Sequence, residues 1–305
     1  MATVVISGGT GMIGTALTEA LLKKGYRVVI LTRDASKKSE QGIRYSQWDP
    51  ERGQMDEEML RKADYVIHLA GANVGASRWS HKRKMEILNS RVKSGELLVK
   101  ALTSASHHVR AFISASAMGY YGPDPEKPGR PFTESDPPAH DYLANVVQHW
   151  ERAVAALHDT SVRTVLLRGG IVLSREGGAF REYLKPFKLG VATILGTGKQ
   201  VISWIHIDDL VRMYIEAMED PHWEGVYNAV APEHVTNEQL IRTMIREGRR
   251  KAMAVRVPVP VLKIALGEMS VEVLKSTTVS SAKTEARGFM FLFPTIKSAV
   301  RNLMR

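Results

Sequence analysis

The chain has 305 residues, with 42 Lys and Arg against 32 Asp and Glu, so its formal net charge is +10 at pH 7. This length and a hydrophobic content of 44% are typical of a globular protein with a sizeable core, and they exclude a mini-protein and a disordered tail. The chain has no cysteine, which excludes a disulfide scaffold, thiolate zinc sites and thiol catalysis.

No segment predicts export or membrane insertion. Met1-Ala2 leads straight into an apolar run over residues 3–6, without the charged start of a signal peptide. No uninterrupted apolar window approaches the roughly 18 residues that a membrane helix needs. We therefore expect a cytoplasmic protein without a membrane partner.

The positive charge is concentrated over residues 78–84 and residues 242–256. The second stretch has six basic residues and one acidic residue, but no aromatic residue on which a base would stack. We therefore expect a solvated helix face and no nucleic-acid partner. A phosphorylated small ligand would use the same basic charge equally well.

The first half of the chain alternates strand-like and helix-like segments. Ile13, Leu17 and Leu21 recur at helical spacing after a short apolar run. This alternation predicts an α/β fold with a doubly wound parallel sheet and helices on both faces. The predicted strands are residues 3–7, 27–31, 43–48, 65–70, 111–116 and 163–167, and the predicted helices are one ending at Lys24, a long one before residue 111 and one over residues 141–158.

A glycine-rich loop follows the first predicted strand. Gly8, Gly11 and Gly14 give the spacing G-x-x-G-x-x-G between an apolar strand and an amphipathic helix, which is the context of a dinucleotide-binding (Rossmann) site. We expect Gly8 to permit the turn, Gly11 to let the pyrophosphate approach the backbone, and Gly14 to let helix and strand pack closely. The alternative is a glycine-rich turn without a ligand.

The helix after this loop would present unpaired N–H groups and the positive end of its dipole to the phosphates. The further cofactor contacts predicted in the loop are Thr10, Met12 and Ile13.

The end of the second predicted strand indicates which dinucleotide binds. NAD-selective sites place an Asp or Glu about 18 to 20 residues beyond the last loop glycine, where it binds the ribose hydroxyls. Here Thr32 occupies that place and Arg33 follows as a bidentate donor for a 2′-phosphate. Asp34 lies in the same window, but we expect it to cap the next turn, and Asp49 is better placed for the adenine. With added charge from Lys37 and Lys38, the sequence predicts NADP(H).

Polar residues follow the predicted strand over residues 111–116. Ser116 lies at its carboxyl end, where open parallel sheets place their ligands. Its hydroxyl either hydrogen-bonds a substrate carbonyl or alcohol, or only satisfies backbone groups at the strand end. Tyr120 and Tyr121 follow, and either one phenol acts on the substrate or both belong to a packed aromatic loop with tethered hydroxyls.

After Arg168 the regular alternation ends, and glycine and proline punctuate the chain. Residues 226–230 are predicted to return to the sheet. Residues 257–261 and 289–293 are predicted strands of a smaller, less regular part.

The chain is therefore expected to form two domains that hold the substrate in a cleft between them. The predicted division is a nucleotide-binding domain over residues 1–169 plus 201–231 and a smaller C-terminal α/β substrate domain over residues 170–200 plus 232–305.

Several strings spread over nearly the whole chain carry a family resemblance. They are Gly8 to Gly14, His68-Leu69-Ala70-Gly71, Ser114-Ala115-Ser116 with Tyr120-Tyr121-Gly122, and Trp204-Ile205-His206-Ile207-Asp208-Asp209. In these the chain resembles the short-chain dehydrogenase/reductase superfamily, in its extended branch of nucleotide-sugar epimerase-like proteins. More narrowly, it resembles an atypical nucleoside-diphosphate-sugar epimerase-like family of uncharacterised function, in strings such as Arg78-Trp79-Ser80, Trp150-Glu151 and Gly177-Gly178-Ala179.

The resemblance implies where the cofactor and substrate lie. Ser116 would stand beside the nicotinamide, with Tyr120 or Tyr121 orienting the reacting oxygen in place of the usual helical Tyr. The further cofactor contacts that it implies are Leu69, Ala70, Gly71, Arg91 and Ser114.

The catalytic pattern of the resembled branch is broken in this chain. Its members usually pair a Tyr with a Lys four residues later on a helix, where the Lys lowers the pKa of the Tyr. Here Val146 lies four residues after Tyr142, and no lysine is available on the predicted helix. A Tyr with its unperturbed pKa near 10 is only about one part in a thousand ionised at pH 7, equivalent to roughly 4 kcal/mol. The sequence therefore argues against ordinary Tyr–Lys hydride chemistry.

A second departure concerns the preceding long helix, where the resembled branch usually carries an Asn. By spacing, that position corresponds to Arg91. Because Arg does not give up its proton, Arg91 would be a charge clamp or an orienting donor and not a base. The alternative is an exposed helical arginine.

The histidines do not predict catalysis or a metal site. The resembled branch has a His-x-x-Asp at a domain junction, so we interpret His206 and Asp209 as structural, and His68 as a strand-end residue. The ten histidines are scattered without ligand spacing, so no metal is expected.

The leading hypothesis is an NADP(H)-dependent oxidoreductase or epimerase-like enzyme acting on a small polar substrate, for which a sugar nucleotide is suggested by the resemblance alone. The alternative is a regulatory or scaffold protein that keeps the dinucleotide site but has lost turnover. The sequence does not indicate an oligomeric state.

Overall fold

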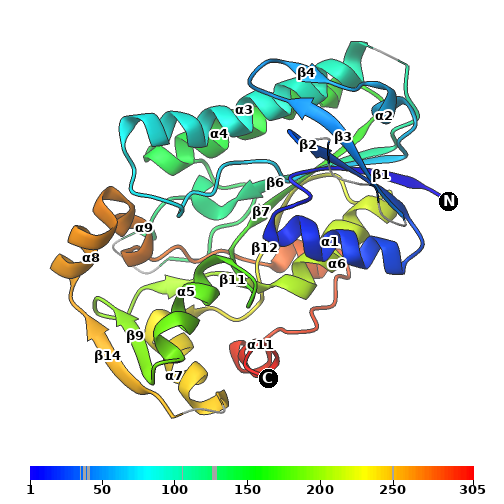
Figure 1. The fold of residues 1–305 in the computed structure, drawn as a ribbon. Helices are drawn as coiled ribbons and strands as arrows, with labels where there is room; N and C mark the ends of the chain where they lie inside the picture. Colours follow the sequence, from blue (N-terminus) through cyan, green and yellow to red (C-terminus); the bar gives the residue numbers. More distant parts are fainter. Residues whose placement is uncertain (35, 37–38, 40–41, 105, 126–128, 249–250) are drawn as a thin grey trace.

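The computed structural model describes residues 1–305 except 35, 37–38, 40–41, 105, 126–128 and 249–250 (Figure 1). Its centre is an eight-stranded sheet with the order β12-β7-β6-β5-β1-β2-β3-β4, in which only β4 runs antiparallel to its neighbour. The strands are β1 (Thr3–Ser7), β2 (Arg27–Thr32), β3 (Ile43–Asp49), β4 (Gln54–Met55), β5 (Tyr65–His68), β6 (Ala111–Ala117), β7 (Arg163–Gly169) and β12 (Gly225–Ala229).

The strand order makes β1 and β5 a topological switch point. From β1 the chain builds β2 and β3 on one side, and β5, β6 and β7 on the other. In open parallel sheets ligands bind outside the carboxyl ends of the strands at such a point. The loop after β1, over residues 8–11, is therefore where the topology favours a ligand.

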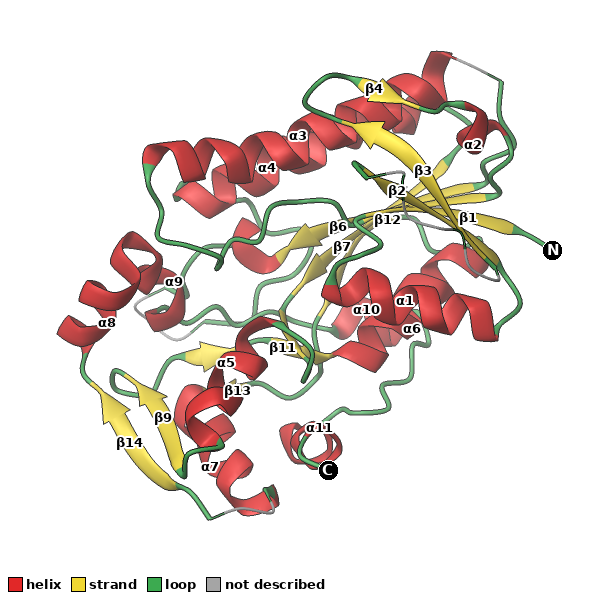
Figure 2. Cartoon of the chain, viewed as in Figure 1, coloured by secondary structure: helices red, strands yellow, loops and turns green. Residues whose placement is uncertain are grey.

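Helices cover both faces of this sheet (Figures 1 and 2). Helices α1 (Met12–Lys23) and α6 (Ile207–Glu219) pack on one face, and α3 (His81–Ser104) and α4 (Tyr142–Val154) pack on the other; the short α2 (Glu58–Arg61) precedes β5. Within β1, Val4 and Ile6 join the core under α1 and α6, whereas Val5 joins the core under α3. Because both faces are covered, the central strands β1, β2 and β5 are apolar without alternation, whereas β3, near the edge, alternates.

The predictions for the first half are confirmed, with differences of a few residues at the ends of the elements. Strand β5 ends at His68 and not at residue 70, and α4 ends at Val154, where a 3₁₀-helix (η2, Ala155–Asp159) continues the predicted helix. Strand β12 confirms the predicted return to the sheet, at its edge beside β7.

A third core contains Phe180, Trp204, Leu240 and Val300, which come from α5, β11, α7 and α11. The elements outside the main sheet are η1 (Met118–Tyr120), β8 (Ile171–Leu173), α5 (Gly178–Phe187), β9 (Val191–Leu195), β10 (Val201–Ile202), β11 (Trp204–His206), β13 (Val235–Thr236), α7 (Asn237–Glu247), β14 (Met253–Val257), α8 (Val259–Leu266), η3 (Gly267–Met269), α9 (Ser270–Leu274), α10 (Ala282–Ala286) and α11 (Ile296–Leu303). They form three two-stranded sheets, β10-β13, β11-β8 and β14-β9.

The predicted strand over residues 257–261 is wrong. Strand β14 ends at Val257, and helix α8 begins two residues later after Pro258. A proline is tolerated in the first turn of a helix, where its missing N–H has no intrahelical acceptor. The apolar run therefore changes from strand to helix in its middle.

The predicted strand over residues 289–293 is also wrong. The amides of Leu292 and Phe293 donate to the buried carboxylate of Asp209 at 2.8 and 2.9 Å, so a side chain takes the place of a neighbouring strand. Phe289 packs against Trp223 in the core under α1 and α6. Phe291 packs with this core as well, whereas Phe293 packs against the third core.

The division into residues 1–169 plus 201–231 and residues 170–200 plus 232–305 stays a prediction. The third core draws mainly on the second set, whereas Phe289 and Phe291 pack with the first.

Part of the basic stretch over residues 242–256 is paired on the protein surface. Arg242 and Arg256 both bond to Glu238, at 2.7 and 2.6 Å. Arg249 and Arg250 lie outside the described residues. In the described part of the chain, no helix is long and apolar enough to cross a membrane.

Candidate functional site

The glycine loop between β1 and α1 is built by close backbone contacts. Gly8 has a φ of +72°, and a Cβ atom there would lie 2.8 Å from the carbonyl carbon of Leu69. A Cβ on Gly14 would lie 2.4 Å from the carbonyl oxygen of Gly8, and the Gly11 amide donates to that same oxygen at 3.0 Å. The loop therefore requires glycine at two of the three predicted positions, and Leu69 of the β5 end lies against it.

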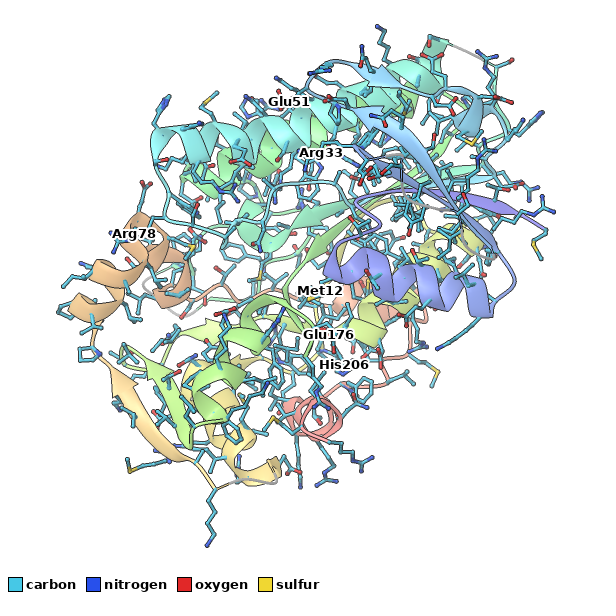
Figure 3. All side chains as sticks on the ribbon, in the orientation of Figure 1. Met12, Arg33, Glu51, Arg78, Glu176 and His206 are labelled. Carbon is cyan, nitrogen blue, oxygen red and sulfur yellow. The ribbon has the colours of Figure 1, made fainter. Side chains whose placement is uncertain are left out.

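Two helix N-termini meet at this loop without capping side chains. Helix α1 starts after Gly11 and α5 starts after Gly177; neither has a side-chain cap or an acidic residue in its first turn. A Cβ on Gly177 would lie 2.9 Å from the sulfur of Met12, and Figure 3 shows Met12 close to Glu176. Uncapped N–H groups and two positive dipole ends favour an anion here. Thr10 lies exposed in the same loop.

The residues after β2 bond to one another and leave the side chain of Arg33 exposed. Asp34 caps its own turn, as expected, because its carboxylate accepts from the amide and the hydroxyl of Ser36 at 3.1 and 2.6 Å. The hydroxyl of Thr32 accepts from the Asp34 amide at 3.2 Å. The exposed guanidinium of Arg33 (Figure 3) has no bond to another described residue. Lys37 and Lys38 lie outside the described residues.

Two other predicted cofactor contacts already have partners within the protein. Asp49, at the end of β3, caps a turn by accepting from the amides of Glu51 and Arg52 at 3.0 and 3.3 Å. Ser114 is buried in β6 and donates to the Ala115 carbonyl at 2.9 Å. Their contacts with a cofactor stay predictions.

His68 is a buried strand-end residue, as expected. Its Nδ1 lies 2.7 Å from the Ser7 hydroxyl and its Nε2 lies 3.3 Å from the Ser94 hydroxyl. Burial lowers its pKa to about 3, so the ring is neutral at pH 7 and does not take up a proton as a base would. Ala70, just beyond the strand, donates its amide to the same Ser7 hydroxyl at 3.4 Å.

Arg91 is largely buried, which excludes the alternative of an exposed helical arginine. Its Nη1 donates to the carbonyls of Ala72 and Ile87 at 3.1 and 3.0 Å, and its guanidinium carbon lies 5.0 Å from the ring centre of Trp150. A Cβ on Gly71 would lie 3.1 Å from that carbon. Burial lowers the pKa of Arg91 to about 10. Arg91 and Gly71 therefore meet beside the end of β5.

Ser116 belongs to a buried ion-pair network that the sequence analysis did not anticipate. Its hydroxyl donates to Glu151 Oε1 at 2.6 Å. Arg168, only 3% exposed, binds both oxygens of Glu151, through Nε and Nη2 at 2.8 Å each. A carboxylate only accepts, so the single O–H of Ser116 is committed to Glu151 and its lone pairs remain for a ligand. The only signals in the sequence were the position of Arg168 after a strand and the string Trp150-Glu151.

The two tyrosines of the loop after β6 make different contacts with this network. The hydroxyl of Tyr121 donates to Asn228 Oδ1 at 2.7 Å and accepts from Arg168 Nη1 at 3.0 Å, and burial raises its pKa to about 12. Tyr121 therefore fits the alternative of a packed aromatic loop with a tethered hydroxyl. The ring of Tyr120 stacks on Arg168 at 3.4 Å, but its hydroxyl has no partner among the described residues.

Tyr142 stands at the start of α4, at the place of the usual helical Tyr. Its hydroxyl donates to the carbonyl of Lys84 at 2.9 Å, and its ring packs edge-on against Trp79 at 5.1 Å. Burial raises its pKa above the usual value. The charges of Arg91 and Arg83 act in the opposite direction but do not outweigh burial, so Tyr142 is not prepared to act as a base.

His206 and Asp209 hold the C-terminal segment, which supports the structural interpretation. His206 Nε2 lies 3.1 Å from Asn302 Oδ1, and its ring stacks on Phe293 at 3.9 Å between centres. Asp209 accepts the backbone amides described above.

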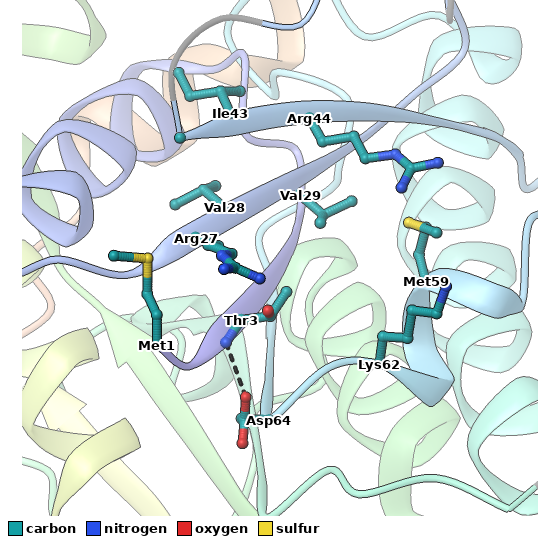
Figure 4. Close-up of a pocket in the computed structure, with 11 residues that line it drawn as sticks. Met1, Thr3, Arg27, Val28, Val29, Ile43, Arg44, Met59, Lys62 and Asp64 are labelled. Carbon is teal, nitrogen blue, oxygen red and sulfur yellow. Dashed lines mark hydrogen bonds between the residues drawn. The ribbon is translucent and has the colours of Figure 1, made fainter.

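A cavity of about 790 Å³ lies at the opposite edge of the sheet (Figure 4). It is lined by the amino ends of β1, β2 and β3, with Thr3 donating its amide to Asp64 at 2.8 Å across its floor. Ligands of parallel sheets bind at the carboxyl ends. The glycine loop, Arg91 and Ser116 lie at those carboxyl ends, so this cavity is not part of the candidate site.

Two family models match the chain. The model of the NAD dependent epimerase/dehydratase family matches residues 4–230, which contain the whole eight-stranded sheet except its first residue. A second model, a domain of unknown function (DUF1731), matches residues 257–303.

Relatives match the chain along nearly its full length. Epimerase family protein SDR39U1 of Mus musculus is 33% identical over 309 residues, covering 99% of both chains. Epimerase family protein YfhF of Bacillus subtilis (strain 168) is 33% identical, covering 99% of this chain and 97% of its own. The crystal structure of human SDR39U1 (isoform 2) with NADPH superposes with a TM-score of 0.87 at 32% identity, covering 99% of each chain. The chain therefore belongs to the NAD dependent epimerase/dehydratase family.

Proposed function

We propose that this protein binds NADP(H) across the β1/β5 switch point and acts as an oxidoreductase or epimerase-like enzyme on a small polar substrate. The observation that carries the proposal is the glycine loop, where two uncapped helix N-termini meet at the carboxyl edge of a Rossmann-type sheet. This arrangement suits a pyrophosphate. The family name suggests a sugar nucleotide as the substrate class.

The choice of NADP(H) over NAD(H) is supported by the residues after β2. Asp34 is occupied by Ser36, so it does not present a free carboxylate to the ribose hydroxyls. The guanidinium of Arg33 is exposed and has no partner among the described residues, which leaves its fork for a 2′-phosphate. The human relative SDR39U1 was crystallised with NADPH.

NADP(H), when bound, would supply the chemistry of hydride transfer through its nicotinamide. The chain's own contribution is to bind and orient the reacting oxygen. Ser116, with its proton committed to Glu151, would accept a hydrogen bond from a substrate hydroxyl. The hydroxyl of Tyr120 has no partner among the described residues, whereas that of Tyr121 is bonded to Asn228 and Arg168, so we propose Tyr120 in preference to Tyr121 for the orienting role.

Titration of the purified protein with NADPH and with NADH, followed by energy transfer from tryptophan to the reduced nicotinamide, tests the cofactor. Arg33→Ala is expected to weaken NADPH binding about 10- to 150-fold, the equivalent of a charge-assisted contact of ~1.5–3 kcal/mol, and to leave NADH binding unchanged. Arg44→Ala, an exposed arginine at the amino end of the neighbouring strand, is the matched control. Equal affinities of the wild type for both dinucleotides would refute the preference.

Turnover is tested by absorbance at the nicotinamide band with aldehydes, ketones, quinones and sugar nucleotides. Ser116→Ala is expected to lower kcat about 10²-fold while cofactor affinity stays within a few-fold, because it removes an orienting group and no cofactor contact.

A second function is favoured by one specific observation. The Tyr142 hydroxyl is tied to a backbone carbonyl and no lysine accompanies it, as expected for a cofactor-binding regulatory or scaffold protein without turnover. Binding of NADPH without turnover or hydride exchange on any substrate of the panel would favour this alternative over the enzyme.

A further inference from the structure

The cavity of about 790 Å³ at the amino edge of the main sheet has no part in the candidate site (Figure 4). Its volume lies within the range of pockets that hold small molecules, roughly 300–1,000 Å³. Three cationic side chains, Arg27, Arg44 and Lys62, line it together with a single carboxylate, that of Asp64. A cavity in which positive charge exceeds negative charge attracts anions.

The register of the sheet places the two arginines on one face. Arg44 of β3 lies beside Val29 of β2, and Arg27 precedes Val29 by two residues. Because side chains alternate along a strand, these three side chains lie on the same face of the sheet. Figure 4 shows Arg27, Arg44 and Lys62 around the same opening. Neighbouring like charges repel, so an anion between them would stabilise the arrangement.

The acidic groups at the cavity already have partners. The carboxylate of Asp64 accepts from the Thr3 amide at 2.8 Å and from Arg110 Nη2 at 3.3 Å. Glu58, which is not part of the lining, pairs with Lys62 at 2.5 Å. The hydrogen bond from Lys62 is the main cause that lowers the pKa of Glu58. These two carboxylates therefore offset mainly Arg110 and Lys62.

Arg27 and Arg44 are left to bind a ligand. Both residues are exposed, and neither guanidinium has a hydrogen bond or an ion pair to a residue that the structure describes. A guanidinium presents a planar fork of donors that matches two oxygens of a phosphate. Val29 and Met59, from the core under α3, supply an apolar part of the lining. Oxyanion donors beside an apolar wall suit a phosphorylated small molecule.

We propose that this cavity is a second ligand site, which binds a phosphate group of a small molecule between Arg27 and Arg44. Lys62 adds a further positive charge at the same opening. The site lies at the start of β1, by Thr3, whereas the glycine loop follows the end of β1 at Ser7. The proposal therefore goes beyond the proposed function and does not depend on it.

The test uses the methyl group of Met59 as a local probe. Protein with isotopically labelled methionine methyl groups is titrated with inorganic pyrophosphate and followed by NMR, and Met59→Leu identifies the signal. We expect a saturable shift of the Met59 signal in the wild type, both with and without NADPH. A shift confined to Met12, beside the glycine loop, would overturn the proposal. A shift of Met59 in a protein that does not bind NADPH contradicts only the proposed function.

The double variant Arg27→Gln/Arg44→Gln removes both charges and keeps polar side chains. We expect it to bind pyrophosphate at least tenfold more weakly, and each single variant to lie between it and the wild type. Lys100→Gln/Arg152→Gln removes two exposed cations of α3 and α4 outside the lining and should bind as the wild type does. Equal affinities of the two double variants would show that the cavity itself does not attract the anion.

A purely structural role of the two arginines predicts a different result. Because removing neighbouring like charges relieves repulsion, the thermal midpoint of Arg27→Gln/Arg44→Gln without ligand is expected to equal or exceed that of the wild type. Pyrophosphate should raise the midpoint of the wild type more than that of the variant. A lower midpoint of the variant together with an unchanged titration of Met59 would overturn the proposal.

Inorganic phosphate and phenyl phosphate distinguish two sources of the same charged group. If the ligand is an organic phosphate that uses the apolar wall, phenyl phosphate binds more tightly and its ring shifts the Met59 signal further. If inorganic phosphate is the ligand, the two bind equally. Both outcomes support the site, whereas a wild type in which neither compound nor pyrophosphate shifts Met59 would overturn it.

Discussion

The two halves of the carboxyl edge of the sheet differ in whether their polar groups have partners within the protein. On the β1/β5 side, the starts of α1 and α5 have no capping side chains, and Arg91 has no counter-ion among the described residues. On the β6/β7 side, Arg168 joins Ser116, Glu151, Tyr121 and Asn228 in one closed network. The first side is incomplete without a ligand, whereas the second is complete without one.

This difference indicates that the β1/β5 side binds a ligand and that the β6/β7 side provides a rigid support. Unpaired N–H groups and an unneutralised arginine are stabilised only when an anion binds, so the β1/β5 side is suited to ligand binding. A fully bonded network inside a low-dielectric interior fixes its members in place. Ser116 is the member of the closed network that faces the ligand edge, so the network supports its orientation and does not itself bind.

Breaking the closed network should have the largest effect on the folded protein. Glu151→Gln leaves Arg168 buried without its carboxylate, and we expect it to lower the free energy of unfolding by about 3–5 kcal/mol, measured by urea denaturation. Glu182→Gln removes the exposed pair with Lys185 and should cost at most about 0.5 kcal/mol. Similar losses for the two variants would show that the network is not a stabilising unit.

The β1/β5 side should be sensitive to a side chain added where two backbone segments lie in contact. Gly8→Ala places a methyl group 2.8 Å from the Leu69 backbone at a φ of +72°, and we expect a loss of about 3 kcal/mol together with loss of NADPH binding. Gly25→Ala is the matched control, because its φ is +84° but no atom lies within 4 Å. It should cost about 1 kcal/mol and bind NADPH normally. Equal losses would mean that φ alone, and not the contact with β5, decides the requirement.

His68, under the junction of the two sides, predicts a pH dependence. Its pKa is about 3 in the folded protein and near 6.5 when unfolded, so folding favours the neutral ring. This contribution is fully present above pH 6.5 and is lost as the pH falls toward 3. Between pH 8 and pH 5 the wild type should lose about 2 kcal/mol more stability than His68→Gln loses over the same interval. Parallel pH profiles of the two proteins would contradict it.

The open side could be predicted from the sequence because its signals are local. The glycine spacing, the strand before it and the helix after it lie within residues 3–23, and the capping by Asp34 needs only the next two residues. The central parallel strands β1, β2 and β5 are apolar runs, which the sequence shows directly.

The closed network could not be predicted because its pairs form through topology. Glu151 on α4 meets Arg168 at the end of β7 only after the chain has packed a helix against the sheet. The same limit explains the failure over residues 289–293, where apolar residues resemble a strand but Asp209, distant in sequence, binds their amides. Alternation of residue types does not reveal a partner 80 or more residues away.

The smallest expected effect separates the two adjacent tyrosines, and it sharpens the comparison most. Tyr121→Phe removes a hydroxyl that bonds both Arg168 and Asn228, so it should cost about 1–2 kcal/mol of stability. Tyr120→Phe removes a hydroxyl without a described partner and should change stability by less than about 0.5 kcal/mol. If the protein turns over a substrate, only Tyr120→Phe should lower kcat beyond what lost stability explains. A catalytic loss confined to Tyr121→Phe would place the closed network itself in the chemistry and would remove the distinction between the two sides.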